Sequence, residues 1–159
     1  MKYLCQLATA TLILALSLDA AAQTKSQADV IVGPFIVNND KDDALRAASE
    51  SCSARLTAAL TAKGVAVARD PQLTEKNLKA ASARWALLGQ LDRKEGQVQL
   101  ELRLMEVKSG EELRSYFGAD KDPQAVCTTA EKAAERVAAF VKEQKNSPRS
   151  ASASQLFRN

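Results

Sequence analysis

Polar and apolar residues alternate strictly between residues 97 and 104, and this pattern constrains the fold more than any other part of the 159-residue sequence. The apolar members are Val98, Leu100, Leu102 and Leu104, and the polar members are Gln97, Gln99, Glu101 and Arg103. Successive side chains of a β-strand point to opposite faces, whereas a helix would scatter these leucines around its circumference. The pattern therefore predicts a strand in an antiparallel sheet that is covered on one side only.

The stretch from Trp85 to Phe117 predicts a three-stranded antiparallel meander around this strand. A two-residue Ser-Gly turn at residues 109–110 would place Leu102 opposite Phe117, and its glycine supplies the positive φ that such turns need. A three-residue loop would instead place a leucine opposite Arg114, which conflicts with the alternation.

The other hairpin of the meander follows the same logic. An even-length turn around residues 94–95 would pair Leu91 with Val98 and keep the apolar residues on one face. Glu106 falls on that face, so we expect it at the sheet rim or beside a bulge. The predicted inner face consists of Trp85, Leu87, Leu91, Val98, Leu100, Leu102, Leu104 and Phe117.

The opposite, polar face of the meander is the candidate binding surface, because the fold does not need it for its own core. Its predicted members are Gln97, Gln99, Glu101, Arg103, Arg114 and Tyr116. An ordinary solvated sheet face explains the same pattern. A partner protein, a small ligand or glycan, or a second copy of the chain are the other occupants that remain open.

The first 22 residues predict a secretory signal peptide. Lys2 gives a positive start, residues 4–18 are apolar, and small residues precede a cleavage point after Ala22. A retained membrane anchor is the alternative, although the apolar run is short for a span. Residues 23–28 then form a short leader. The sequence thus predicts a periplasmic or secreted protein with no stable membrane insertion after cleavage.

The length and element pattern predict a single domain over residues 29–145, with a Ser/Ala-rich disordered tail over residues 146–159. The fold class is α/β, mixed with α+β character, in the order β-α-β-α-β-β-β-α. We expect a mixed five-stranded sheet with helices packed on one or both faces. The predicted elements are strands at 29–37 and 65–68, helices at 41–63, 75–83 and 123–145, and the meander.

Several polar residues mark the expected helix ends. Residues 38–40 (Asn-Asn-Asp) are N-cap candidates for the first long helix, with Asp42 and Asp43 in its first turn. Capping explains this acidic cluster better than a calcium site, which would need a glycine turn and a terminal glutamate. Gly64 suits the position after the helix, and Asp122 precedes a proline where the last helix should begin.

Two cysteines, Cys52 and Cys127, remain in the chain after the predicted cleavage. Both lie on the apolar faces of predicted helices, and export would place them in an oxidising compartment. A disulfide between them is one hypothesis. Two buried free thiols that act as small hydrophobic residues are the other.

The composition excludes several classes of chemistry. The sequence has no histidine, which removes Ser-His-Asp catalysis, Cys-His catalysis and histidine metal sites. It has no Cys-x-x-Cys pair and no glycine-rich phosphate loop. The 22 basic and 19 acidic residues are interspersed, and aromatic residues are few, so nothing indicates nucleic-acid binding. We therefore expect a non-enzymatic protein without cofactor or metal.

Three segments resemble one known family. VIVGPFIVNND is similar to the first strand of TolB amino-terminal-like domains, residues 86–118 resemble their hairpin and leucine-rich strand, and AVCTTAEKAAERVAAFV resembles their closing helix. The same fold recurs in CsgG-like, FlgO-like and LpoB-like proteins. The resemblance implies a periplasmic domain that works by contact with envelope proteins, and it brings no catalytic residues. The chain lacks the β-propeller, the lipobox cysteine and the channel-forming insertions of various relatives.

Overall fold

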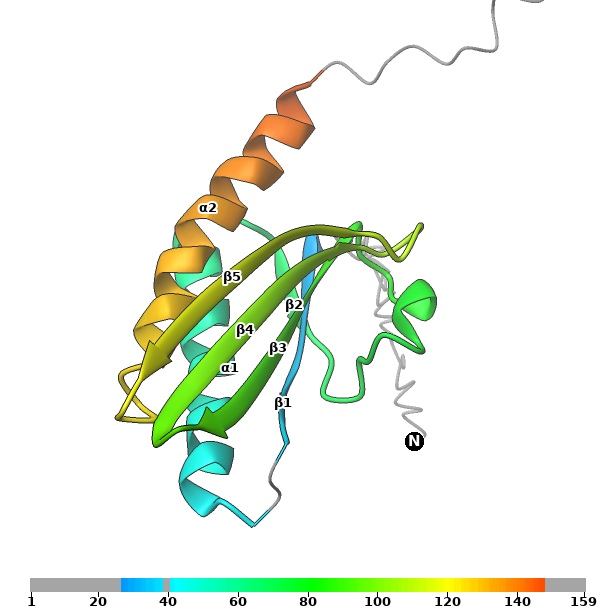
Figure 1. Cartoon of the computed structure of the whole chain (residues 1–159). Coiled ribbons are helices and arrows are strands. Elements are labelled where there is room, and N and C mark those ends of the chain that lie inside the picture. The colour runs from blue at the N-terminus through cyan, green and yellow to red at the C-terminus, as the bar shows by residue number, and fades with distance from the viewer. Residues whose placement is uncertain (1–26, 39–40, 148–159) are drawn as a thin grey trace, which may run out of the picture.

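A mixed five-stranded sheet forms the centre of the molecule in the computed structural model, which describes residues 27–38 and 41–147 (Figure 1). The elements are β1 (Val30–Val37), α1 (Asp43–Ala62), β2 (Val67–Arg69), the short 3₁₀ helix η1 (Leu78–Ala80), β3 (Trp85–Lys94), β4 (Gln97–Glu106), β5 (Glu112–Asp120) and α2 (Cys127–Asn146). The predicted signal peptide (1–22), most of the leader and the tail from residue 148 lie outside the described residues.

The strand order is β2-β1-β3-β4-β5. β1 is parallel to both β2 and β3, whereas β3, β4 and β5 form the antiparallel meander. The parallel pair needs the long α1 crossover, and the meander needs only short turns. The predicted α/β class, element order and meander are confirmed. The predicted helix at 75–83 is reduced to the three-residue η1.

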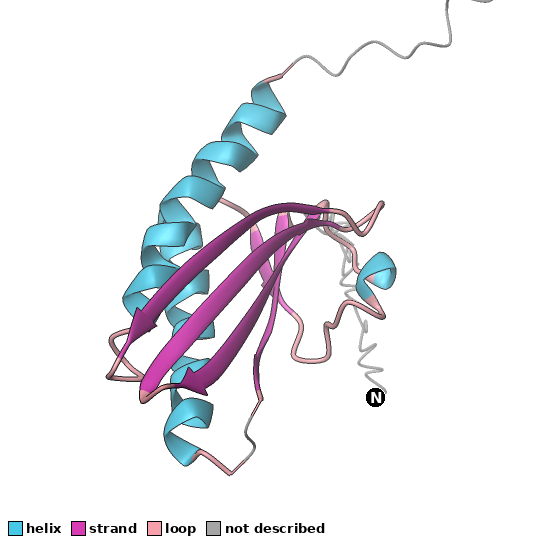
Figure 2. Ribbon diagram, viewed as in Figure 1, coloured by secondary structure: helices cyan, strands magenta, loops and turns pink. Residues whose placement is uncertain are grey.

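Both long helices cover the same face of the sheet, which we call the inner face (Figure 2). Its strand residues are Val30, Val32, Phe35, Trp85, Leu87, Leu91, Val98, Leu100, Leu102, Leu104 and Tyr116. α1 and α2 add their apolar stripes to the same cluster, and the Trp85 and Phe140 rings meet edge to face at 5.8 Å. This continuous apolar layer is the main source of stability.

The turn between β3 and β4 consists of Glu95 and Gly96, both with positive φ, as the tight turns of hairpins require. Leu91 consequently pairs with Leu100 rather than with Val98, so the predicted pairing was wrong by two residues. A shift of two residues keeps every side chain on its predicted face, because the strand period is two.

The pairing of β5 with β4 corrects the sequence prediction more seriously. Leu102 lies opposite Tyr116, not Phe117, for two reasons. The connection after β4 is longer than the predicted two-residue turn, since the Glu106 N–H donates to the Glu111 carbonyl, and Leu113 is then inserted as an extra residue. The rejected alignment of Leu104 with Arg114 is therefore the observed one. A one-residue shift exchanges the faces, so Tyr116 is buried and Phe117 is exposed.

The pairing of β1 carries a second register shift, which the proline within this strand explains. The register with β3 shifts between Val32 and Phe35, on either side of Pro34, as expected of a proline inside a strand. Phe35 then lies over Gly89, where an added Cβ would come within 2.4 Å of the ring. Gly89 is thus a glycine because Phe35 occupies the space of its side chain.

The outer face of the sheet is covered over only part of its area. The connection from β2 to β3, residues 70–84, crosses this face and carries η1, on the side of the sheet away from the long helices (Figure 1). We call it the cover segment. It forms a second apolar cluster with the sheet, made of Ile31, Leu73, Leu78, Ala83, Ala86, Leu88, Met105 and Val107. No other segment within residues 27–38 and 41–147 covers the remaining part of the outer face.

Candidate functional site

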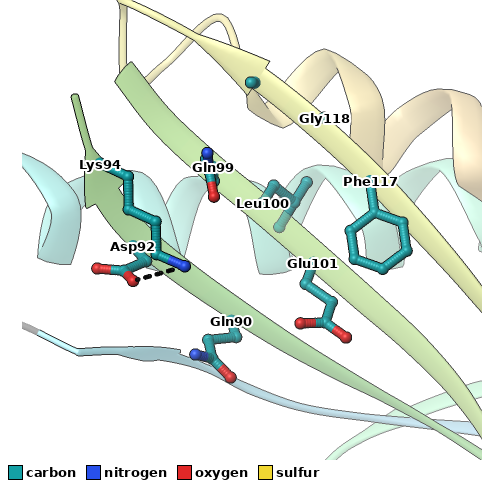
Figure 3. Close-up of a pocket in the computed structure, with 9 residues that line it drawn as sticks. Gln90, Asp92, Lys94, Gln99, Leu100, Glu101, Phe117 and Gly118 are labelled. Carbon is teal, nitrogen blue, oxygen red and sulfur yellow. Dashed lines mark ion pairs between the residues drawn. The ribbon is translucent and has the colours of Figure 1, made fainter. Parts of the chain in front are cut away.

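The uncovered part of the outer face forms a shallow hollow of about 480 Å³ across β3, β4 and β5. Figure 3 shows Gln90 on β3, Glu101 on β4 and Phe117 on β5 as neighbours on this surface. Asp92, Lys94 and Gln99 lie toward the β3–β4 turn. We call this surface the outer-face site.

One row of the sheet gives the site its apolar character. Ile36 pairs with Gln90, Gln90 with Glu101, and Glu101 with Phe117, so four strands contribute one residue each. Phe117 is 70% exposed and Ile36 is 49% exposed, and they are the two exposed large hydrophobic residues of the described chain. The row thus carries an apolar residue at each end and two hydrogen-bonding side chains between them.

The charges of the outer-face site are nearly balanced. Lys94 Nζ lies 3.8 Å from Asp92 Oδ2, and Arg103 Nε lies 3.9 Å from Glu101 Oε1. Arg103 also forms an ion pair with Glu75 of the cover segment, and this contact marks the boundary between the covered and uncovered parts of the face. Exposed pairs of this kind contribute little stability, so these side chains remain available to a partner.

The structure divides the six predicted surface residues between the two faces. Gln97, Gln99, Glu101 and Arg103 alternate with the buried residues of β4 and so lie on the outer face. Tyr116 belongs to the inner cluster. Arg114 lies 5.2 Å from the Phe140 ring centre of α2, so these last two placements were wrong.

Sequence reasoning missed Phe117, Ile36, Gln90 and Asp92 as members of the site. The inserted residue in β5 moved Phe117 to the outer face, and nothing in the alternation of β4 indicates that insertion. Ile36 follows the bulge of β1 in a nearly continuous apolar run, where no alternation distinguishes the two faces.

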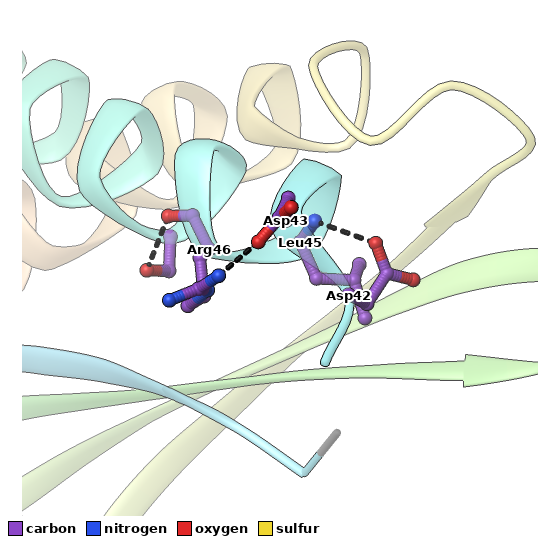
Figure 4. Close-up of polar contacts among 5 residues, drawn as sticks. Asp42, Asp43, Leu45 and Arg46 are labelled. Carbon is purple, nitrogen blue, oxygen red and sulfur yellow. Dashed lines mark hydrogen bonds and ion pairs between the residues drawn. The ribbon is translucent and has the colours of Figure 1, made fainter. Parts of the chain in front are cut away.

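Asp42 is the N-cap residue of α1. The sequence predicts this role for residues 38–40, of which residues 39 and 40 lie outside the described residues. Asp42 Oδ1 accepts a hydrogen bond from the Leu45 N–H at 3.1 Å, and Asp43 pairs with Arg46 (Figure 4). A hydrogen bond from the Arg93 side chain, and then that of the Leu45 amide, lower the pKa of Asp42. Capping thus accounts for this acidic cluster.

The last helix begins later than predicted. α2 starts at Cys127 after a helical Val126, which makes no side-chain cap. Asp122 instead accepts a hydrogen bond from the Gln124 N–H at 2.9 Å and stabilises the turn before the helix.

A disulfide joins Cys52 of α1 to Cys127 of α2 in the structure, with a Cα–Cα separation of 4.6 Å. Both residues are fully buried in the inner cluster. The bond lies on the helix side of the sheet, away from the outer-face site, and it ties together the two helices that cover the inner face.

Neither a metal-binding cluster nor a membrane-spanning helix occurs within the described ranges. In residues 27–38 and 41–147 there is no group of three or more His, Cys, Asp or Glu side chains that could hold a metal ion. No helix among the same residues is both long and apolar enough to cross a membrane.

No family model matches the chain, and no curated protein matches its sequence. Solved structures with a similar fold include the PelC dodecamer from Paraburkholderia phytofirmans, with 21% identity, a TM-score of 0.49, and coverage of 72% of this chain and 88% of that one. TolB from Acinetobacter baumannii has 14% identity and a TM-score of 0.43, with coverage of 76% of this chain and 29% of that one. The LpoB C-terminal domain from Escherichia coli has 17% identity and a TM-score of 0.36, with coverage of 63% and 88%.

Proteins named TolB and LpoB, whose domains the sequence resembles, thus occur among the solved structures with a similar fold. The likeness is distant, and it concerns the backbone fold alone.

Proposed function

We propose that this chain is an exported, non-catalytic module of the bacterial cell envelope that binds another protein through the outer-face site. The observation that carries the proposal is the 70% exposure of Phe117 on a part of the sheet that no other element of the described residues covers. An exposed aromatic residue surrounded by hydrogen-bonding groups is typical of the centre of a protein interface. The predicted signal peptide and the absence of histidine support the same class of function.

Burial of the Phe117 ring against a partner would contribute substantially to the free energy of binding. An aromatic side chain presents roughly 200 Å² of surface, and 70% of the Phe117 side chain is accessible. Covering that surface would contribute about 3 kcal/mol at ~25 cal/mol per Å². The partner would therefore place an apolar side chain over Phe117 and hydrogen-bond donors opposite Glu101 and Gln90.

The test is crosslinking in living cells with a photoreactive amino acid at position 117. The matched control carries the same amino acid at Lys132, an exposed position on α2, far from the outer face. We expect a discrete adduct with an envelope protein from position 117 alone, and its loss when Ile36→Glu is added. Equal envelope-protein adducts from both positions, or an envelope-protein adduct insensitive to Ile36→Glu, would contradict the proposal. An adduct between two copies of this chain is scored separately and does not count as a partner.

A glycan is the second candidate ligand, and the composition of the hollow favours it. The hollow places one aromatic ring beside the amides of Gln90 and Gln99 and the carboxylates of Asp92 and Glu101. Sugars bind to such sites by stacking on the ring and by hydrogen bonding to the polar groups. Calorimetric titration with soluble peptidoglycan fragments tests this candidate. Binding that Phe117→Ser abolishes supports it, and no detectable heat removes it.

A further inference from the structure

β5 is an edge strand whose outer side pairs with no other strand of the described chain. The opposite edge of the sheet is formed by β2, which has only three residues. A long open edge presents a row of free N–H and C=O groups and is a template for another strand. β5 has nine residues, so it is the edge that offers a substantial ladder.

We propose that β5 pairs in antiparallel fashion with β5 of a second copy of this chain, around a two-fold axis at Phe117. The extra residue at Leu113 ends the regular part of the strand, which runs from Arg114 to Asp120 in unbroken register with β4. Phe117 is the midpoint of that segment, with Arg114 three residues before it and Asp120 three residues after it. A two-fold axis at this point uses the whole regular segment in both copies.

Charge complementarity favours a second copy and this register. With Phe117 on the axis, Arg114 of each copy lies opposite Asp120 of the other, and both side chains belong to exposed residues. Moving the axis to Tyr116 would instead place Glu112 opposite Asp120, and moving it to Arg114 would oppose two guanidinium groups. Opposite charges stabilise a cross-strand pair, and like charges destabilise it.

The uncharged positions of the segment are also compatible. Phe117 would lie beside Phe117 of the second copy on the outer face, where aromatic cross-strand pairs are favourable. On the inner face Tyr116 would lie opposite Gly118, whose side-chain position is filled by Thr129 of α2, so Tyr116 would meet Thr129 there. A two-fold axis through a residue places equivalent residues of the two copies opposite each other. Their N–H and C=O groups therefore point out of the edge at matching positions, and the hydrogen bonds between the strands can form whether it is Phe117 or its neighbours whose groups point outward.

The assembly would join two five-stranded sheets into one continuous sheet. Both pairs of helices would lie on the same side, and the two Phe117 rings would form a single apolar area on the other. A protein or glycan could still contact the outward surfaces of these rings. The dimer is therefore independent of the proposed function, and each can fail without the other.

Charge reversal tests the pairing directly. The full-length sequence is expressed, and the mass of the exported protein is measured by light scattering. We expect the mass of two chains for the wild type. Arg114→Asp and Asp120→Arg should each reduce it to one chain, because each opposes like charges. The double variant R114D/D120R should recover two chains. A monomeric wild type, or single variants that stay dimeric, would overturn the proposal.

Cysteine crosslinking tests the position of the axis. Phe117→Cys should form an intermolecular disulfide under mild oxidation, since opposed residues lie within disulfide reach. Ala119→Cys is the matched control, because the two copies of position 119 would be about 14 Å apart along the strand. Equal crosslinking of both variants would overturn the register. Ile36→Glu should leave the dimer intact, which separates this test from that of partner binding.

Discussion

Glu101 and Leu102 are neighbours in β4, yet they belong to surfaces with different roles. Leu102 is fully buried beneath the helices, whereas Glu101 is partly exposed in the outer-face site. The inner face is closed by two helices and a disulfide, and the outer face is closed only over the part beneath the cover segment. Substitutions on the inner face should therefore change stability, and substitutions in the outer-face site should change binding.

The disulfide should have the largest effect, because it joins the two helices that cover the inner face. Cys52 and Cys127 close a loop with a sequence separation of 75, and in the chain-entropy model this contributes about 4 kcal/mol. We expect the C52A/C127A double variant to lose about that much in urea unfolding without reductant. A variant whose unfolding midpoint matches that of the wild type would show that the inner layer does not depend on this bond.

The adjacent residues Tyr116 and Phe117 provide the sharpest contrast between the faces. Tyr116→Ala should cost about 3 kcal/mol of unfolding free energy, because it opens a cavity in the inner cluster. Phe117→Ala should change the same quantity by less than about 0.5 kcal/mol, because its ring is largely exposed. Both are measured by urea unfolding. A larger loss of unfolding free energy in Phe117→Ala than in Tyr116→Ala would instead support the register predicted from the sequence and contradict the bulge at Leu113.

Gly89→Ala should have an intermediate effect on the inner face. Its Cβ would collide with the Phe35 ring, and overpacking of this kind costs about 2 kcal/mol. Adding Phe35→Leu should recover part of the loss, so the two effects should not be additive. A double-mutant cycle in urea measures the coupling. Strict additivity would show that the two residues are not in contact.

The smallest effect concerns the cap of α1. The hydrogen bond from the Arg93 side chain holds the pKa of Asp42 below its usual value of 3.8. The folded state therefore prefers the charged carboxylate, and this contribution is present above the unfolded pKa and lost as the pH falls through the folded one. Asp42→Asn keeps a capping side chain without the charge, so its deficit relative to the wild type should shrink below pH ~4. Unfolding curves at several pH values measure it, and a deficit independent of pH would exclude this linkage.

The strands, the meander and most of the inner face could be predicted from the sequence, because the alternation around Leu102 fixes which side chains share a face. The face of the sheet on which each side chain of β5 lies could not be predicted. Tyr116 and Phe117 are both aromatic, so either can fill the core, and the insertion at Leu113 is visible only in the pairing. The candidate site was consequently predicted in its β4 part and missed at Phe117 and Ile36. The cover segment was missed because its leucines follow no regular period.

The cover segment also limits how far a ligand aligned with the strands could extend along the outer face. Four rows of the outer face lie on the uncovered side, running from the Lys94–Gln97 row beside the β3–β4 turn to the row of Arg103, whose ion pair with Glu75 closes the site. Adjacent rows are about 7 Å apart, so the open length along the strands is about 20 Å. A ligand aligned with β4 can therefore insert only a few residues or sugar units, whereas one that crosses the strands meets no such barrier. A ligand of the proposed site would thus be selected by its orientation relative to the strands as well as by its chemistry.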